Sequence, residues 1–388
     1  MVSTLVHRGY RFKLKTTSDM EAVFRTMVGH ARFVWNKALR LNLDRLEQGL
    51  PIVWYNDLCG LLRLWKQSEE YGFLAEANAQ SLQQKLRDLD RAFTDAFDTA
   101  EPMKRLPRFK KRGVGGSFRL PQDVKVENRR VFLPKIGWVG FFKSCEVPGT
   151  IKNATVTREA DGWYVSIQTE AEIPEPNLHI GPAIGVDRGV AVFAATSDGE
   201  LVDPVNSYAK SMERLARLQR KLARQSKGSR NRAKTKARIA RLHQSIRRQR
   251  ADFLHKVSTR WSKSHALIVL EDLRIGNMTR SAKGTVDRPG SHVVQKSGLN
   301  RAILDQGWGE IGRMLAYKLP ERGAHLLLAP PQQSSQECSE CGHVAPENRS
   351  TRGLFRCVAC GYTEHADVNA AKIVLSRGLW LLEHQLAG

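Results

Sequence analysis

The first hundred residues pass from an alternating pattern to helical periodicity. Residues 2–15 alternate loosely between apolar and basic side chains, which predicts a strand with one face on a core. A capping-box pattern, Ser-Asp-Met-Glu at residues 18–21, then opens a long helix that Leu50-Pro51 ends. Further helices are expected at about residues 57–66 and 79–99. The second of these carries on one face Leu82, Leu86, Leu89, Phe93 and Phe97.

A basic linker, residues 104–112, ends this helical block, and short β-branched and aromatic runs follow it. Residues 131–142 and 154–168 are predicted strands, the latter a hairpin that turns at Asp161-Gly162. The simplest arrangement returns these strands to the N-terminal one. We therefore expect a small β domain interrupted by a helical insertion, with residues 172–177 as the linker out of it.

The next stretch predicts strands, a helical hairpin and a further strand. Residues 183–203 are typical of three short antiparallel strands, the first of which holds Asp187. Residues 210–250 contain one acid, Glu213, and their leucines and isoleucines recur at helical spacing on both sides of a turn. This pattern predicts a helical hairpin with an apolar seam and a cationic exterior. Residues 265–272 are an apolar run that ends in two acids, as expected of a strand buried on both faces.

The remaining chain has weaker signals before its cysteines. Residues 274–298 show no periodicity and predict a mobile loop, followed by a helix at 300–319 and a strand at 324–329. The cysteine region comes next, and a last helix is expected to run through Leu382.

The charge balance points to a polyanionic partner. The 388 residues include 62 Lys and Arg against 39 Asp and Glu, for a net charge of +23. Nucleic acid is the leading candidate, because the excess is large and locally concentrated. A membrane surface is the other common polyanion, but the sequence has no long apolar run, signal peptide or lipidation motif. We expect no membrane partner and a cytoplasmic, nucleoid-associated location.

The cysteines predict a structural zinc site. Cys338, Cys341, Cys357 and Cys360 have the spacing C-x2-C-x15-C-x2-C, in which each pair supplies two thiolates to one tetrahedral ion. A closed four-thiolate shell leaves no position for water, so this zinc is expected to organise the chain without catalysing. The other two cysteines are far apart in the sequence, which indicates a reducing compartment and no disulfide framework.

Three acids share a context that suggests catalysis. Asp187 lies within the first strand of the second half, Glu271 ends a later buried strand, and Asp367 opens the last helix. Three strands, a crossover helix and a strand parallel to the first are the order of an RNase H-like fold, in which the first and fourth strands are neighbours. Two Mg²⁺ ions on such carboxylates activate water for phosphodiester hydrolysis. Asp272 remains an alternative to Glu271 as a ligand.

These residues resemble a known family. The segments 185–189 (Gly-Val-Asp-Arg-Gly), 270–273 (Leu-Glu-Asp-Leu) and 365–371 (His-Ala-Asp-Val-Asn-Ala-Ala), with the cysteines, resemble the three RuvC motifs and zinc finger of TnpB. TnpB proteins are insertion-sequence-encoded, RNA-guided nucleases related to type V CRISPR effectors. The resemblance extends to residues 32–36, 82–93, 107–111, 133–138 and 334–338. His365-Ala366 and Ile373-Val374 depart from the usual Asp-Arg and Asn-Ile, and neither departure removes a ligand.

The resemblance implies a multidomain α/β fold, in which a RuvC nuclease domain carries a zinc ribbon and a wedge β-barrel carries a helical recognition insertion. The implied domains are a first wedge strand in 1–16, the recognition lobe in 17–103, the rest of the wedge barrel in 104–180, the RuvC domain in 181–337 with its basic hairpin in 209–258, the zinc ribbon in 338–360, and the third RuvC motif with the C-terminal helix in 361–388.

The resemblance also implies a bacterial origin, a guide RNA from the transposon end, double-stranded target DNA with a short adjacent motif, and Asp187, Glu271 and Asp367 as ligands of two Mg²⁺ ions. Tyr55, Asn78 and Gln80 are candidates for reading the motif, although a role in the helix surface or core fits them equally. The candidate phosphate contacts are Lys104, Arg105, Arg108, Lys110, Lys111, Arg217, Arg220, Lys221, Arg224, Arg230, Arg232 and Lys234.

Two other functions fit part of the sequence. A TnpB-like RNA-guided repressor would bind DNA without cleaving it, but such repressors typically lose one or more of the carboxylates that are intact here. A DNA transposase or accessory protein would use similar acids, and strand joining would distinguish it. We expect a monomer within the ribonucleoprotein, although the sequence does not define the oligomeric state.

Overall fold

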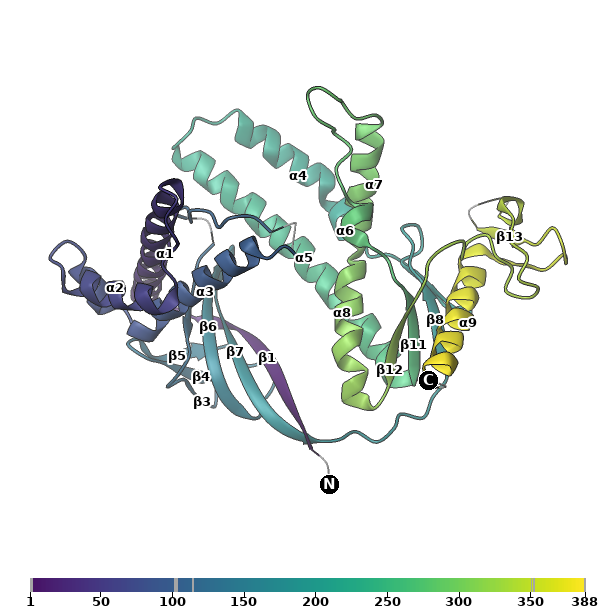
Figure 1. The fold of residues 1–388 in the computed structure, drawn as a ribbon, viewed down its shortest axis with the longest axis horizontal. Helices are drawn as coiled ribbons and strands as arrows, with labels where there is room; N and C mark the ends of the chain where they lie inside the picture. Colours follow the sequence, from purple (N-terminus) through teal and green to yellow (C-terminus); the bar gives the residue numbers. More distant parts are fainter. Residues whose placement is uncertain (1–2, 101–103, 114, 350, 352, 387–388) are drawn as a thin grey trace. The chain divides into compact units, whose positions relative to one another are not determined.

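The structure is a computed structural model that describes residues 3–100, 104–113, 115–349, 351 and 353–386 (Figure 1). The chain forms two compact units, Met1–Pro174 and Glu175–Gly388. Within the described ranges, no helix is both long enough and apolar enough to cross a membrane.

The first strand organises the first unit. β1 (Ser3–Lys15) pairs antiparallel with β7 along most of its length and with β5 at its end, so the predicted return of later strands to the N-terminal strand is confirmed. The sheet order is β2-β6-β7-β1-β5-β4-β3. The described strands pair in a linear order with β2 and β3 at its two ends, so closure of the sheet into a barrel stays a prediction. The other strands are β2 (Ser117–Leu120), β3 (Lys125–Glu127), β4 (Arg130–Leu133), β5 (Gly137–Phe141), β6 (Thr150–Glu159) and β7 (Gly162–Pro174).

Two hairpins of this sheet test the predicted turns. β6 and β7 are joined at Asp161-Gly162, as expected. Residues 131–142, in contrast, do not form one strand, because β4 and β5 pair with each other across a turn. Pro134 has no N–H to donate, and Lys135 and Gly137 both have positive φ, so the chain reverses there.

Three helices pack together beside the sheet: α1 (Ser18–Glu47), α2 (Tyr55–Gln67) and α3 (Ala79–Phe97), with the 3₁₀ turn η1 (Gly72–Glu76) between the last two. The cap of α1 is one residue earlier than predicted, because the Thr17 hydroxyl accepts from the Met20 N–H at 3.3 Å. Four of the five predicted apolar positions of α3 are buried, but Phe97 is 48% exposed, since it is the last residue of the helix.

The second unit has a five-stranded sheet of order β10-β9-β8-β11-β12. β8 pairs antiparallel with β9 and parallel with β11, so the prediction that the first and fourth strands are neighbours is confirmed. Every residue of β11 is buried, as its apolar sequence predicted. The strands are β8 (Ala183–Asp187), β9 (Ala194–Thr196), β10 (Leu201–Val202), β11 (Leu267–Glu271) and β12 (His325–Ala329).

The predicted basic hairpin is present as α4 (Ser207–Ala223) and α5 (Arg230–Ser264). The segment that follows β11 differs from the prediction. The loop is shorter than 274–298, and the single helix at 300–319 is instead two helices, α7 (Val293–Gln306) and α8 (Trp308–Lys318). Gly307 lies between them with φ of +74°, a left-handed conformation that breaks the helix at low cost for glycine. The short elements α6 (Ile275–Met278) and η2 (Pro320–Arg322) flank this pair.

The cysteine region consists of η3 (Pro346–Asn348) and a two-stranded ribbon, β13 (Leu354–Arg356) and β14 (Thr363–His365). The ribbon leads directly into α9 (Ala366–Leu386), which packs on the sheet beside β8 (Figure 1). A Cβ on Gly185 of β8 would lie 2.1 Å from the Ala371 carbonyl oxygen, and one on Gly378 would lie 2.4 Å from Val269. Two glycines therefore allow α9 to lie closer to the sheet than side chains would permit.

Candidate active site and nucleic-acid interface

Two of the predicted acids end neighbouring parallel strands. Val186 of β8 is paired with Leu270 of β11, so Asp187 and Glu271 follow this pair at the same edge of the sheet. Asp367 lies in the first turn of α9, immediately after the ribbon. The sheet and the helix thus bring three carboxylates from distant parts of the chain close enough to interact electrostatically.

The electrostatics of Asp187 show that these acids interact. Burial, the charges of Glu271 and Asp367, and a hydrogen bond with the Glu271 carboxyl group raise the pKa of Asp187 to about 8, and Arg349 opposes the rise. Asp272, the alternative to Glu271, is exposed, and its N–H donates to the Ala329 carbonyl. Glu271 is 6% exposed and is the acid that faces Asp187.

Three polar residues to which the sequence analysis assigned no role surround the acids. Ser334 donates its hydroxyl to Glu271 Oε1 at 3.0 Å. Arg188 is buried and donates to the backbone carbonyls of Glu271 and Trp308. Arg349 Nη2 is 2.8 Å from Asp367 Oδ1. Two of these residues could have been found from the sequence, because Arg188 follows Asp187 directly and Ser334 begins a segment that resembles the family. Nothing in the sequence marked Arg349.

The helix that carries Asp367 is also tied to the segment between β12 and the cysteines. Arg377 of α9 donates to the carbonyls of Pro330 and Gln332 at 2.8 and 2.7 Å and pairs with Glu337. Asn369 is fully buried and donates to the Glu337 carbonyl at 2.7 Å. Because Ser334 lies inside this segment, the supports of Glu271 and of Asp367 belong to one hydrogen-bonded assembly.

The four cysteines converge as predicted. Their sulfur atoms all lie within 4.8 Å of one another. The Sγ–Sγ distances are 3.7 Å for Cys338–Cys360 and 3.5 Å for Cys341–Cys357. Zn–S bonds of about 2.3 Å in a tetrahedron would place sulfurs about 3.8 Å apart, so the spacing fits a zinc ion. Each pair ends in a glycine with positive φ, Gly342 and Gly361, where the chain turns around the site.

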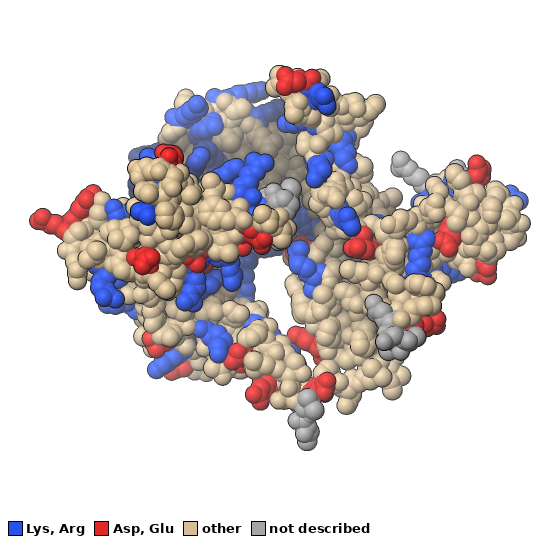
Figure 2. Space-filling model, in the orientation of Figure 1, with Lys and Arg blue, Asp and Glu red and all other residues tan. Residues whose placement is uncertain are grey.

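The basic hairpin presents most of its predicted contacts to solvent. Arg217, Arg220, Lys221 and Arg224 line one surface cavity of about 480 Å³ on α4. Figure 2 shows Lys and Arg side chains gathered over the region of α4 and α5. Arg230 and Lys234 are exposed on α5. Arg232 differs, because its guanidinium donates to the carbonyls of Leu222 and Gln225 and so caps the end of α4.

The basic linker of the first unit is held on α1. The Trp35 indole donates to the Arg108 carbonyl at 3.1 Å, and the Asn36 amide bonds both the N–H and the carbonyl of Lys110. Arg105 and Lys111 remain exposed, while Lys104 pairs with Asp95 at 3.1 Å. Lys110 is exposed as a whole residue, but its ammonium lies over the Trp35 ring, 3.6 Å from the ring centroid. Burial, and then the charge of Lys85, lower the pKa of Lys110 to about 8, with Asp88 opposing.

The candidate motif readers have local structural roles. The Asn78 side chain accepts from the Ser81 N–H and caps α3. Gln80 donates to Gln122 Oε1 at 2.7 Å. Tyr55 is half-buried, with the Arg87 guanidinium 4.8 Å above its ring. The structure leaves Gln80 and Tyr55 partly accessible, and motif reading stays a prediction for all three.

Known proteins match this chain along nearly its whole length. It is 46% identical over 373 residues to "Putative RNA-guided DNA endonuclease InsQ" of Escherichia coli (strain K12), covering 96% of this chain and 92% of that protein. The chain belongs to the OrfB (TnpB) family. A second member, "Putative RNA-guided DNA endonuclease" of Streptomyces pristinaespiralis, is 31% identical over 390 residues and 90% of its length is covered.

Three family descriptions match separate parts of this family member. Residues 166–282 match "Probable transposase" (OrfB_IS605), and residues 308–374 match "Cas12f1-like, TNB domain". Residues 1–50 match "Helix-turn-helix domain", although their described part forms the strand β1 and the uninterrupted helix α1. The fold is similar to that of Cas12f1 in a complex with guide RNA and target DNA, with a TM-score of 0.51 and 13% identity over 92% of this chain and 83% of that one.

Proposed function

We propose that this protein is an RNA-guided DNA endonuclease whose Asp187, Glu271 and Asp367 hold the catalytic metal ions of an RuvC-type, RNase H-like domain. The supporting observation is the electrostatic interaction of these three carboxylates, two of them at one edge of a sheet of order β10-β9-β8-β11-β12 and the third in the first turn of α9. The family relatives named as putative RNA-guided DNA endonucleases support the same reaction.

The acid cluster fits hard divalent cations. It offers only oxygen donors, and a bound cation would offset both the burial and the mutual repulsion that raise the pKa of Asp187. Two Mg²⁺ ions would supply an activated water and stabilise the leaving oxygen of a phosphodiester. The chain's own part is to hold the carboxylates: Ser334 orients Glu271, and Arg188 fixes the end of β11.

The other parts of the protein take supporting roles in this proposal. A zinc ion held by the four thiolates fixes the ribbon from which α9 begins. The guide RNA reads the target by base pairing, while the protein contacts backbone phosphates and a short duplex motif. The exposed cations of α4 and α5 are the proposed phosphate contacts of the second unit.

A cleavage assay tests the proposal. The protein is purified with its RNA and incubated with a matching target plasmid and Mg²⁺, beside an EDTA control. Asp187→Ala should abolish cleavage and leave RNA binding intact, whereas Asp272→Ala, which changes the exposed acid next to Glu271, should cleave normally. Robust cleavage by Asp187→Ala would refute the assignment, and DNA binding without cleavage by the native protein would favour a repressor.

The family description "Probable transposase" supports a second candidate, strand transfer by the same acids. Joining of a cut element end to target DNA in the same reaction would favour it. Cleavage products without joined strands would favour the nuclease.

A further inference from the structure

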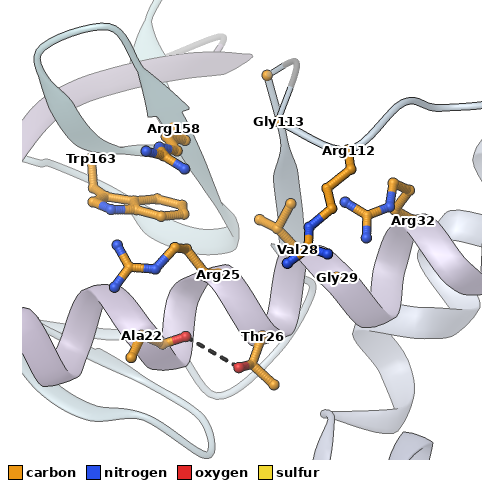
Figure 3. Close-up of a pocket in the computed structure, with 11 residues that line it drawn as sticks. Ala22, Arg25, Thr26, Val28, Gly29, Arg32, Arg112, Gly113, Arg158 and Trp163 are labelled. Atoms are coloured by element: carbon orange, nitrogen blue, oxygen red, sulfur yellow. Dashed lines mark hydrogen bonds between the residues drawn. The ribbon is translucent and has the colours of Figure 1, made fainter. Parts of the chain in front are cut away.

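The first unit contains a cationic groove along α1 that lies outside the acid cluster. One cavity, of about 640 Å³, is lined by Arg25 and Arg32 of α1, Arg112 of the linker and Arg158 of β6. Figure 3 shows Arg25 and Arg158 on either side of the Trp163 ring, with Arg32 and Arg112 at the other end. Trp163 is 1% exposed, so it is a rigid apolar floor for this cavity.

A second cavity continues the first. It has a volume of about 440 Å³ and shares Val28, Arg32 and Gly115 with its neighbour. Its own cations are Lys85 of α3 and Lys110 and Lys111 of the linker. We call the two cavities together the α1 groove.

The linker is fixed in place over α1. Besides the bonds from Trp35 and Asn36, Gly116 comes so close to the helix that a Cβ on it would lie 2.4 Å from Val28 Cγ1. The groove therefore has walls that are set by packing and hydrogen bonds, and its cations come from four separate segments of the chain.

The positive charge of the groove is only partly neutralised. Among the residues that the structure describes, no acid lines either cavity. Arg25 pairs with Glu21 and Lys85 with Asp88, but Arg32, Arg112 and Arg158 form no ion pair with any residue that the structure describes. Burial is the main cause of the lowered pKa of Lys110, and the charge of Lys85 adds to it, so a second cation lies close to Lys110 in this groove.

The size and lining of the groove favour a single strand. Cavities of these volumes accommodate groups of small-molecule size, and a duplex is too wide to enter them. Phe109 lines the second cavity and is 45% exposed, which offers an aromatic surface next to the cations. Exposed aromatic rings beside cations are the usual elements of single-strand recognition, in which bases stack and phosphates are neutralised.

We propose that the α1 groove binds an unpaired segment of a nucleic-acid strand, with phosphates on Arg32, Arg112 and Arg158 and a base stacked on Phe109. The inference rests on the proposed function, because a guide RNA brings unpaired strand to the protein. RNA and single-stranded DNA share this chemistry, and the experiment separates them.

The test measures binding of fluorescein-labelled strands to the full chain by anisotropy at several salt concentrations. The probes are a single-stranded RNA, the DNA of the same sequence, and its duplex. For Arg32→Ala/Arg112→Ala, the negative slope of log affinity against log salt should become shallower by about 1.4 on single strands, at about 0.7 per lost phosphate contact. Phe109→Ala should weaken single-strand binding roughly tenfold with an unchanged slope.

The matched control replaces two exposed arginines of the same unit that line neither cavity, Arg63→Ala/Arg129→Ala. It should match the native protein on single strands, and circular dichroism checks that all variants fold. A loss of affinity for RNA alone would show that the groove binds RNA. An equal loss of affinity for RNA and for single-stranded DNA would show that it binds the phosphate backbone common to both. An unchanged slope, or a loss confined to the duplex, would overturn the proposal.

The assay needs no cleavage, so it separates the two hypotheses. If Asp187→Ala still cleaves but the groove variants lose single-strand affinity, the catalytic assignment fails and the groove stands. If cleavage requires Asp187 and the groove variants bind normally, the groove fails and the nuclease stands.

Discussion

The Ser334 hydroxyl donates to Glu271 Oε1 at 3.0 Å, across 63 residues of sequence. Glu271 is almost fully buried and shares a hydrogen bond with Asp187, so in the proposed site this hydroxyl would orient the Glu271 carboxylate toward a metal ion. Hydrogen-bond partners of metal ligands typically contribute 10–100-fold to metal affinity or activity.

Ser334→Ala should therefore lower the cleavage rate roughly 10–100-fold at limiting Mg²⁺ and recover partly at high Mg²⁺. A Mg²⁺ titration of the cleavage rate measures this effect. Ser335→Ala is the matched control, because Ser335 is next in sequence and has no such bond to the acids. Equal Mg²⁺ dependence in both variants would show that the Ser334 bond is dispensable.

Gly185→Ala should disturb the acid cluster through packing. Its Cβ would lie 2.1 Å from the Ala371 carbonyl oxygen, so α9 must move away from β8. We expect a loss of about 1–3 kcal/mol in the free energy of unfolding, as for other overpacked sites, together with reduced cleavage. Chemical denaturation and the plasmid assay measure the two effects.

Gly276→Ala serves as the control for this substitution, because a Cβ at Gly276 would meet no atom within 4 Å. If Gly185→Ala unfolds at the native denaturant midpoint and cleaves at the native rate, close packing of α9 does not set the geometry of the acids.

Loss of zinc should reduce cleavage indirectly. The ribbon leads straight into α9, and the Ala366 N–H donates to the Gly353 carbonyl at 3.1 Å, so a disordered ribbon would release the turn that carries Asp367. Cys357→Ser should lower the bound zinc and the cleavage rate together, while Cys145→Ser, at an exposed cysteine outside the cluster, should change neither. Metal analysis beside the cleavage assay gives the answer. A folded, fully active Cys357→Ser protein without zinc would break the proposed link.

The pKa of Lys110 predicts a pH dependence of nucleic-acid binding. With a pKa of about 8, its ammonium is charged at neutral pH and loses its proton above that value. Single-strand affinity should therefore fall as the pH rises through about 8. Lys110→Arg should flatten this part of the profile, because a guanidinium stays charged. Anisotropy at constant ionic strength measures both profiles, and identical profiles would exclude Lys110 as the titrating contact.

The lowered pKa of Lys110 also predicts how the folding stability depends on pH. Between a folded pKa of about 8 and the ordinary value of 10.5, the unfolded chain binds a proton that the folded chain does not. The contribution of Lys110 to folding stability should therefore rise with pH across that window. Denaturant unfolding of the native protein and of Lys110→Met at both ends of the window tests the sign.

The sequence was sufficient to predict the fold wherever a local pattern of residues constrains how the strands are arranged. The apolar run of β11 predicted a central strand buried on both faces, and a strand parallel to β8 places Glu271 beside Asp187. The cysteine spacing was equally specific. The hairpin signal at Asp161-Gly162 also located its turn, since glycine there has the backbone freedom that the turn needs.

The remaining features depend on contacts between distant residues. Arg349 is one arginine among many until the fold brings it to Asp367. Arg232 matched the pattern of a phosphate contact, but its guanidinium reaches back to the carbonyls at the end of α4. The break at Gly307 was missed because apolar residues continue at helical spacing on both sides of it.

The pairing of β1 has a consequence for synthesis of the protein. Ser3 is paired with Pro174, and the other neighbour of β1 is β5 (Gly137–Phe141), so both partners of the first strand are made long after it. While the ribosome completes residues 16–136, the helices can assemble locally, but β1 presents two unpaired edges. The nascent first unit therefore has a period in which its N-terminal strand is open to wrong partners, and chaperone protection would matter most before residue 174 has emerged.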